Sequence, residues 1–91
     1  MHEIHLLGSL REGESAQVEQ ITSEGSMERR LLDLGLTEGT RVTCVQKAPS
    51  GDPSAYLIRG AVVALRRADA DRVMTGPVET VLSGAGRTAL A

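Results

Sequence analysis

Few side chains in this sequence could hold a metal ion or attack a substrate, and those few are scattered. His2 and His5 are three positions apart, but no cysteine, histidine or carboxylate set beside them completes four metal ligands. Cys44 lies among apolar residues in a strand pattern, where a free cysteine is usually a small buried side chain. We therefore predict two solvated histidines, no metal site and no reactive thiolate.

The sequence also lacks the residue sets on which common enzyme classes depend. It shows no Ser/His/Asp or Cys/His arrangement, no phosphate-binding loop and no pair of carboxylates placed for acid–base catalysis. We predict a protein that is not an enzyme, has no catalytic residues and needs no cofactor.

Two pairs of adjacent arginines, Arg29-Arg30 and Arg66-Arg67, are the remaining groups of chemical interest. Acidic residues lie close to each pair in the sequence, which is typical of a solvated, charged surface. The alternative is that one of the pairs contacts an acidic surface on another protein.

The composition indicates one folded domain with an aliphatic core. Of the 91 residues, 41% are hydrophobic and 24% are charged, with no tryptophan, no phenylalanine and the single tyrosine Tyr56. Proline-rich peptides and single-stranded nucleic acids are normally bound by aromatic side chains, so both functions are disfavoured. A formal net charge of −2 is equally unsuited to a phosphate backbone, and we expect no nucleic-acid partner.

The single cysteine cannot form an internal disulfide, which favours a cytoplasmic protein. No apolar run approaches the ~18 residues that suggest a membrane span, so we expect no direct membrane insertion. The first residues also lack the basic flank and the long apolar stretch of a secretion signal.

A short amphipathic helix is predicted to begin at Met27. Met27, Leu31 and Leu34 share one helical face, and Ser26 stands where an N-cap residue belongs. Gly35 is predicted to end the helix in a left-handed conformation, with Leu31 and Leu36 as the apolar pair of a Schellman motif.

The rest of the chain has the pattern of short strands joined by turns. After an N-terminal arm that turns at Gly13, apolar residues and turn signals predict five strands and one helical turn before the last strand. The strands are expected at 16–22, 41–48, 55–58, 61–65 and 73–78, with Arg59-Gly60 as a two-residue hairpin turn and a single helical turn within 66–73. Ala16, Val18 and Gln20 should share a face of the first strand, until Ile21 breaks the alternation and indicates a bulge. Short strands with tight turns favour a small antiparallel barrel.

Three segments in register resemble the FeoA family. They are Leu31-Leu32-Asp33-Leu34-Gly35-Leu36-Thr37-Glu38-Gly39, Ala48-Pro49-Ser50-Gly51-Asp52-Pro53 and Leu65-Arg66-Arg67-Ala68. The resemblance covers roughly residues 6 to 78 and implies a mainly β, five-stranded antiparallel SH3-like barrel. We therefore expect a single domain over residues 1–80 and a disordered tail over 81–91.

The resemblance also implies a function. FeoA-like proteins work with the membrane ferrous-iron transporter FeoB, so the expected role is a non-catalytic accessory protein that binds the cytosolic part of FeoB. Because that transporter carries a GTP-binding domain, one of the arginine pairs could instead supply an arginine finger. Two further alternatives are a regulatory domain like that of metal-dependent repressors, binding a peptide or a transition metal, and a homo-oligomer formed through an open barrel edge.

The partner surface is expected on the outward side of the helix and on the loop at 49–53. Loops and exposed faces of a rigid barrel are common places for binding residues. Leu32 is included on the condition that it faces outward. The candidate partner-binding residues are Arg29, Arg30, Leu32, Asp33, Ser50 and Asp52.

Overall fold

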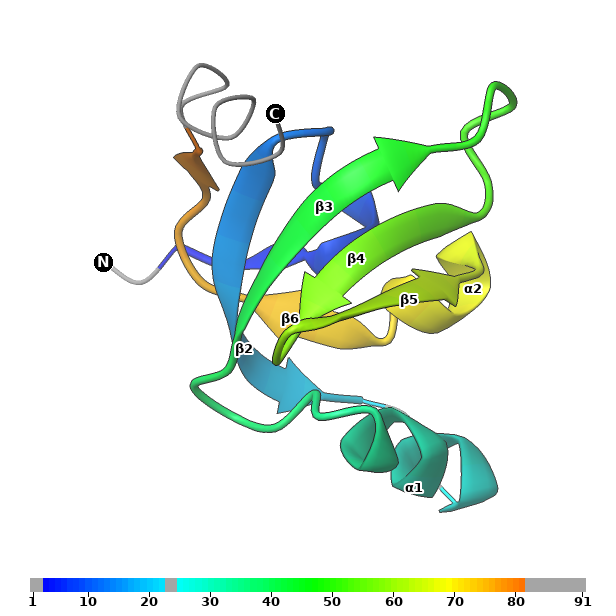
Figure 1. The fold of residues 1–91 in the computed structure, drawn as a ribbon. Helices are drawn as coiled ribbons and strands as arrows, with labels where there is room; N and C mark the ends of the chain where they lie inside the picture. The colour runs from blue at the N-terminus through cyan, green and yellow to red at the C-terminus, as the bar shows by residue number, and fades with distance from the viewer. Residues whose placement is uncertain (1–2, 23–24, 82–91) are drawn as a thin grey trace.

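The computed structural model describes residues 3–22 and 25–81 of the chain, which fold around a curled antiparallel sheet (Figure 1). Along the chain the elements are β1 (His5–Leu6), the 3-10 turn η1 (Leu7–Ser9), β2 (Glu14–Ile21), α1 (Gly25–Asp33), β3 (Arg41–Lys47), β4 (Ser54–Ile58), β5 (Ala61–Leu65), α2 (Arg67–Ala70), β6 (Val73–Thr75) and β7 (Glu79–Thr80).

The sheet order is β1-β6-β2-β3-β4-β5, and β7 pairs separately with β2. Every pairing among the described strands is antiparallel, which confirms the predicted fold class. The prediction of five strands was short by the two-residue strands β1 and β7. The last predicted strand also stops at Thr75 and not at Val78, and pairing with β2 resumes only at Glu79, after Gly76-Pro77.

The predicted irregularity in β2 is present. Its register against β6 shifts between Val18 and Gln20, so Ile21 is partly buried against the core. Ala16 and Val18 are buried as expected, but Gln20 is exposed, because the bulge ends the simple alternation of faces.

Aliphatic side chains from the strands, η1 and α1 make up most of the core. Tyr56 is the largest buried side chain, and its hydroxyl donates to the carbonyl oxygen of Leu7 at 3.4 Å, which joins β4 to η1. Cys44 is fully buried, as predicted, and this burial raises the pKa of its thiol.

Helix α1 starts at Gly25, so Ser26 lies inside the first turn and is not the N-cap that the sequence suggested. The C-terminal end has the predicted Schellman geometry. The Leu36 amide donates to the Leu31 carbonyl at 3.1 Å, the Gly35 amide donates to the Leu32 carbonyl at 2.9 Å, and Gly35 has a φ of 100°. Leu31 and Leu36 are both fully buried, so this turn fastens the helix to the core.

The predicted two-residue turn between β4 and β5 also contacts the segment that follows α1. Arg59 and Gly60 have φ values of 49° and 84°, as a type I′ hairpin turn requires. The Arg59 guanidinium donates to the Gly35 carbonyl at 3.3 Å and to the Thr37 and Thr40 hydroxyls at 3.1 and 3.2 Å. The hairpin turn is thereby tied to the segment that connects α1 to β3.

Replacing Gly35 with alanine should therefore be more damaging than the same change at Gly39. Both glycines have positive φ, which costs an alanine about 1–2 kcal/mol. A Cβ at Gly35 would also lie 2.8 Å from Cδ of Arg59, whereas a Cβ at Gly39 would meet nothing within 4 Å. We expect Gly35→Ala to lower the free energy of unfolding by about 2–3 kcal/mol, and Gly39→Ala by about half as much.

Urea denaturation of the two variants measures this difference. Equal losses of stability would show that the contact between Gly35 and Arg59 contributes nothing.

Candidate protein-interaction surface

The six predicted partner-binding residues lie at opposite ends of the β3–β4 hairpin. Arg29, Arg30, Leu32 and Asp33 are on α1, whose C-terminal end is tied to Arg59 in the β4–β5 turn. The loop at 48–53 joins the other ends of β3 and β4, where Lys47 pairs with Ser54 (Figure 1). Strands of this length separate the two places by roughly 20 Å, so they do not form one compact site.

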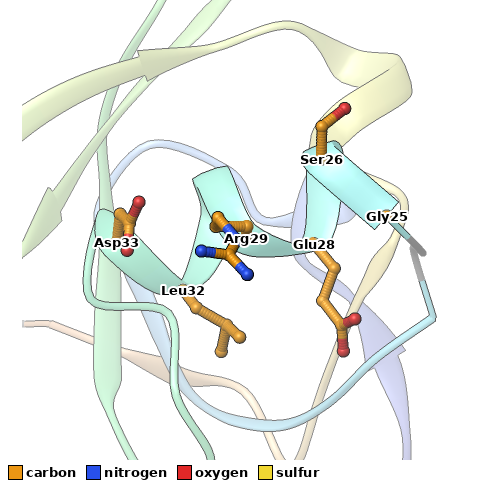
Figure 2. Close-up of a pocket in the computed structure, with 6 residues that line it drawn as sticks. All are labelled: Gly25, Ser26, Glu28, Arg29, Leu32 and Asp33. Carbon is orange, nitrogen blue, oxygen red and sulfur yellow. The ribbon is translucent and has the colours of Figure 1, made fainter.

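The outward side of α1 presents an apolar side chain among charged ones. Leu32 has 43% of its surface exposed and faces outward, which meets the condition under which it was predicted. The side chains of Glu28 and Leu32 extend to the same side of the helix (Figure 2). We call the exposed set that lines this shallow depression the α1 face: Gly25, Ser26, Glu28, Arg29, Leu32 and Asp33.

A second depression continues from the α1 face toward β2. Glu28 and Leu32 border both hollows, and the buried Val18 and Leu36 lie at the bottom of the second one. Glu38 adds a second carboxylate to its rim. Leu32 is therefore the apolar centre of a continuous surface that runs from the helix to the sheet.

The charges of Arg29 and Asp33 on the α1 face, and of Arg30 beside it, are not used to hold the fold together. Within residues 3–22 and 25–81, Arg29, Arg30 and Asp33 take part in no side-chain hydrogen bond or ion pair. Asp33 also lies in the last turn of α1, where a negative charge is unfavourable to the helix dipole. These side chains are available to another molecule.

The loop residues, by contrast, have structural partners. Asp52 accepts a hydrogen bond from the Arg67 amide at 2.9 Å, which caps the start of α2. The Ser50 hydroxyl donates to the Asp52 carbonyl at 2.9 Å. These bonds order the loop and connect it to the segment after β5, a contact that sequence reasoning had missed.

Three further residues belong to this surface or support it, although they were not among the predicted binding residues: Glu28, Glu38 and Arg59. Glu28 is four positions before Leu32, and this helical spacing could have placed the two on one face. Glu38 and Arg59 carry no comparable local signal, because their roles depend on how the α1–β3 connection packs against the hairpin turn.

The described part of the chain contains no group of three histidine, cysteine, aspartate or glutamate side chains placed to hold a metal ion. Nε2 of His5 lies 2.8 Å from a Glu3 carboxylate oxygen, and His2 lies outside the described residues. Among residues 3–22 and 25–81, we find no helix with the length and apolar character needed to cross a membrane.

Comparisons with known proteins agree with one another. A family model described as the FeoA domain matches residues 5–76. A relative from Porphyromonas gingivalis (strain ATCC BAA-308 / W83), named Fe(2+) transport protein A/Fe(2+) transporter FeoB fusion protein, is 35% identical over 79 residues. These residues are 87% of this chain but only 9% of that relative.

Solved structures give the same result for the fold. An FeoA-like protein from Clostridium acetobutylicum superposes with a TM-score of 0.75 at 30% identity, covering 90% of this chain and 92% of that one. FeoA from Stenotrophomonas maltophilia, solved in complex with zinc and described as a prokaryotic SH3 domain protein, also has a TM-score of 0.75 at 30% identity. That match covers 84% of this chain and 96% of the other, and it confirms the expected SH3-like fold.

Two aspartates from the predicted set should behave differently when they are replaced. Asp52→Ala removes the acceptor for the Arg67 amide, so we expect the free energy of unfolding to fall by about 1 kcal/mol. Asp33→Ala removes an unfavourable charge from the end of α1, and the change should stay within about 0.5 kcal/mol or be slightly stabilising.

Thermal and urea denaturation of both variants test this assignment. A larger loss of stability for Asp33→Ala than for Asp52→Ala would reverse the two roles.

Proposed function

The chain belongs to the FeoA family, and from that premise we propose that it is a non-catalytic, cytoplasmic accessory protein of ferrous iron uptake. It binds the cytosolic part of the transporter FeoB and modulates transport. The observation that carries this proposal is the relative in which FeoA and FeoB sequences form one fusion protein.

Fusion of two proteins supports a physical association between them. A tether keeps two domains at an effective concentration in the millimolar range, so even a weak contact is occupied. The contact itself must still come from the surface of the FeoA domain. The α1 face suits this role, because it combines an exposed apolar side chain with charges that have no partner in the described fold.

Leu32 is the proposed anchor of the contact, and Arg29, Arg30 and Asp33 are its polar rim. Protein–protein interfaces gain most of their affinity from a few central side chains that become fully desolvated. Leu31 beneath the face and the Schellman turn after it hold the helix in place, so little ordering is needed on binding. Ser50 and Asp52, at the far end of the hairpin, are proposed as a secondary contact.

Binding modulates the transporter by favouring one of its conformations or assemblies. A bound protein shifts such an equilibrium only through its different affinities for the two states. This mechanism requires neither a bound metal ion nor a reaction on the accessory protein itself.

Truncating Leu32 tests the contact. We expect Leu32→Ala to weaken binding to the purified cytosolic part of FeoB by about 10-fold, as the loss of an interface anchor does. The matched control is Leu6→Ala, because Leu6 has a similar exposed fraction of 41% but lies on β1. This control should change the dissociation constant by less than about twofold.

Biolayer interferometry gives the affinities, and melting temperatures show whether both variants are folded. Unchanged binding of a folded Leu32→Ala chain, or an equal loss in Leu6→Ala, would contradict the proposed surface.

A second experiment separates docking from catalysis. We expect single-turnover GTP hydrolysis by the G domain of FeoB to change less than about twofold when the chain is added, because docking alone supplies no group to the phosphates. An arginine finger would accelerate hydrolysis by about 10³–10⁵. An acceleration of that size, lost in Arg29→Ala or Arg66→Ala, would contradict the non-catalytic role.

A further inference from the structure

Strand β5 forms one end of the sheet. Among the described strands it pairs only with β4, on one side, so its other edge is open within residues 3–22 and 25–81 (Figure 1). Four of its five residues are at least partly exposed, and Val62 has 65% of its surface exposed. The strand at the other end of the sheet, β1, is only two residues long. Among the described edge strands, β5 is therefore longer than the two-residue strands β1 and β7.

The hairpin register identifies the backbone groups at this edge. Ile58 and Ala61 flank the two-residue turn as a hydrogen-bonded pair, and such pairs alternate along an antiparallel ladder. Val62 and Ala64 therefore point their N–H and C=O groups away from β4. Within the described residues, no other backbone or side-chain hydrogen bond reaches these groups.

Natural proteins usually protect such an edge with a lysine, a proline, a bulge or a covering segment. Residues 61–65 contain no charged residue and no proline, and their register against β4 is regular. Next to the edge, Val62 pairs with Leu57, whose surface is 39% exposed. An added strand would therefore bond to free main-chain groups and bury an apolar surface.

The charge at the C-terminal end of β5 indicates what that strand should be. Arg66 follows β5 and does not lie within ion-pair distance of a carboxylate in the described part of the chain, whereas the guanidinium of Arg59, before β5, is bonded to the α1–β3 connection. A second copy of β5 pairing antiparallel about Val63 would bring Arg59 opposite Arg67 of that copy. Because like charges opposite each other are destabilising, self-pairing in this register is disfavoured.

We propose that the β5 edge binds an extended segment of another protein, with small or apolar side chains at its centre and an aspartate or glutamate near the end that lies beside Arg66. The segment adds a strand beside β5, bonding to Val62 and Ala64, while its carboxylate reaches Arg66. About seven residues, or roughly 23 Å of extended chain, cover β5 and both of its ends. This site is separate from the α1 face and does not depend on the proposed binding of FeoB.

The test uses the full chain and a capped synthetic peptide of about seven residues, with glutamate at both ends and alternating valine and threonine between them. We expect the amide hydrogens of Val62 and Ala64 to exchange at least about 10-fold more slowly when the peptide is bound. The amide of Val63 already bonds to β4 and serves as the internal reference. Absence of protection at millimolar peptide would overturn the proposal.

Two further comparisons test whether the glutamates of the peptide and the charge of Arg66 contribute to binding. A peptide with glutamine in place of both glutamates should bind several-fold more weakly, and Arg66→Gln should weaken binding of the glutamate peptide by about threefold or more. The matched control is Arg11→Gln, an equal loss of charge at an exposed residue before β2. Equal affinities for the two peptides, or equal effects of the two variants, would contradict the charge recognition.

Two changes test the main-chain pairing. Val62→Pro removes the outward donor at an edge position, where proline is tolerated, and should abolish binding. A peptide N-methylated at the positions that face β5 should also lose binding, without any change to the protein. Retained affinity in either case overturns the proposal.

Amide exchange and oligomeric state measured before the peptide is added would show whether something else already covers the β5 edge. A concentration-dependent dimer that Val62→Pro abolishes would assign the edge to a second copy. Protection of Val62 and Ala64 that is independent of concentration would assign it to a segment of the same chain. Either result would contradict the proposed partner, whereas fast exchange of both amides supports it.

Discussion

The bonds between Arg59 and the α1–β3 connection are the constraint on which the rest of the structure depends. Residues 34–40 must reverse the chain from a helix into a strand without a long linker. Gly35 makes this reversal with a positive φ, and the Arg59 guanidinium holds the connection with three hydrogen bonds, each contributing on the order of 1 kcal/mol. The connection is also bound to β2, because the Gly39 amide donates to the Val18 carbonyl at 2.7 Å. Helix α1 is therefore fixed to one end of the sheet.

This arrangement puts the candidate functions on the surface of the molecule. The core is filled by aliphatic side chains and Tyr56, and the two candidate binding surfaces are an exposed helix face and an exposed strand edge. Arg59 connects them, because its backbone forms the turn that leads into β5 while its side chain fastens the segment after α1. A change at Arg59 would therefore disturb both surfaces, and Leu32 and Val62 are better positions at which to separate them.

Features set by neighbouring residues could be predicted from the sequence, and features set by tertiary contacts could not. The Schellman turn at Gly35 and the hairpin turn at Arg59-Gly60 each depend on a few adjacent residues, and both are present. The two-residue strands β1 and β7 are too short for any alternation, and they form because longer strands offer them a partner. The bond from Asp52 to the Arg67 amide joins distant parts of the chain, so the sequence could not show that Asp52 supports the fold.

The separation of α1 from the loop at 48–53 follows from the register of β3 and β4, which a residue pattern does not contain. The proposed function thus depends on which of these two places would contact FeoB. Amide chemical-shift mapping of the intact, isotope-labelled chain during titration with the cytosolic part of FeoB measures this most directly. We expect the largest shift changes in α1, around Arg29 and Leu32, and no shift of Leu7 and Leu10 in the core. No change at saturation, or changes centred on residues 48–53 with α1 unaffected, would contradict it.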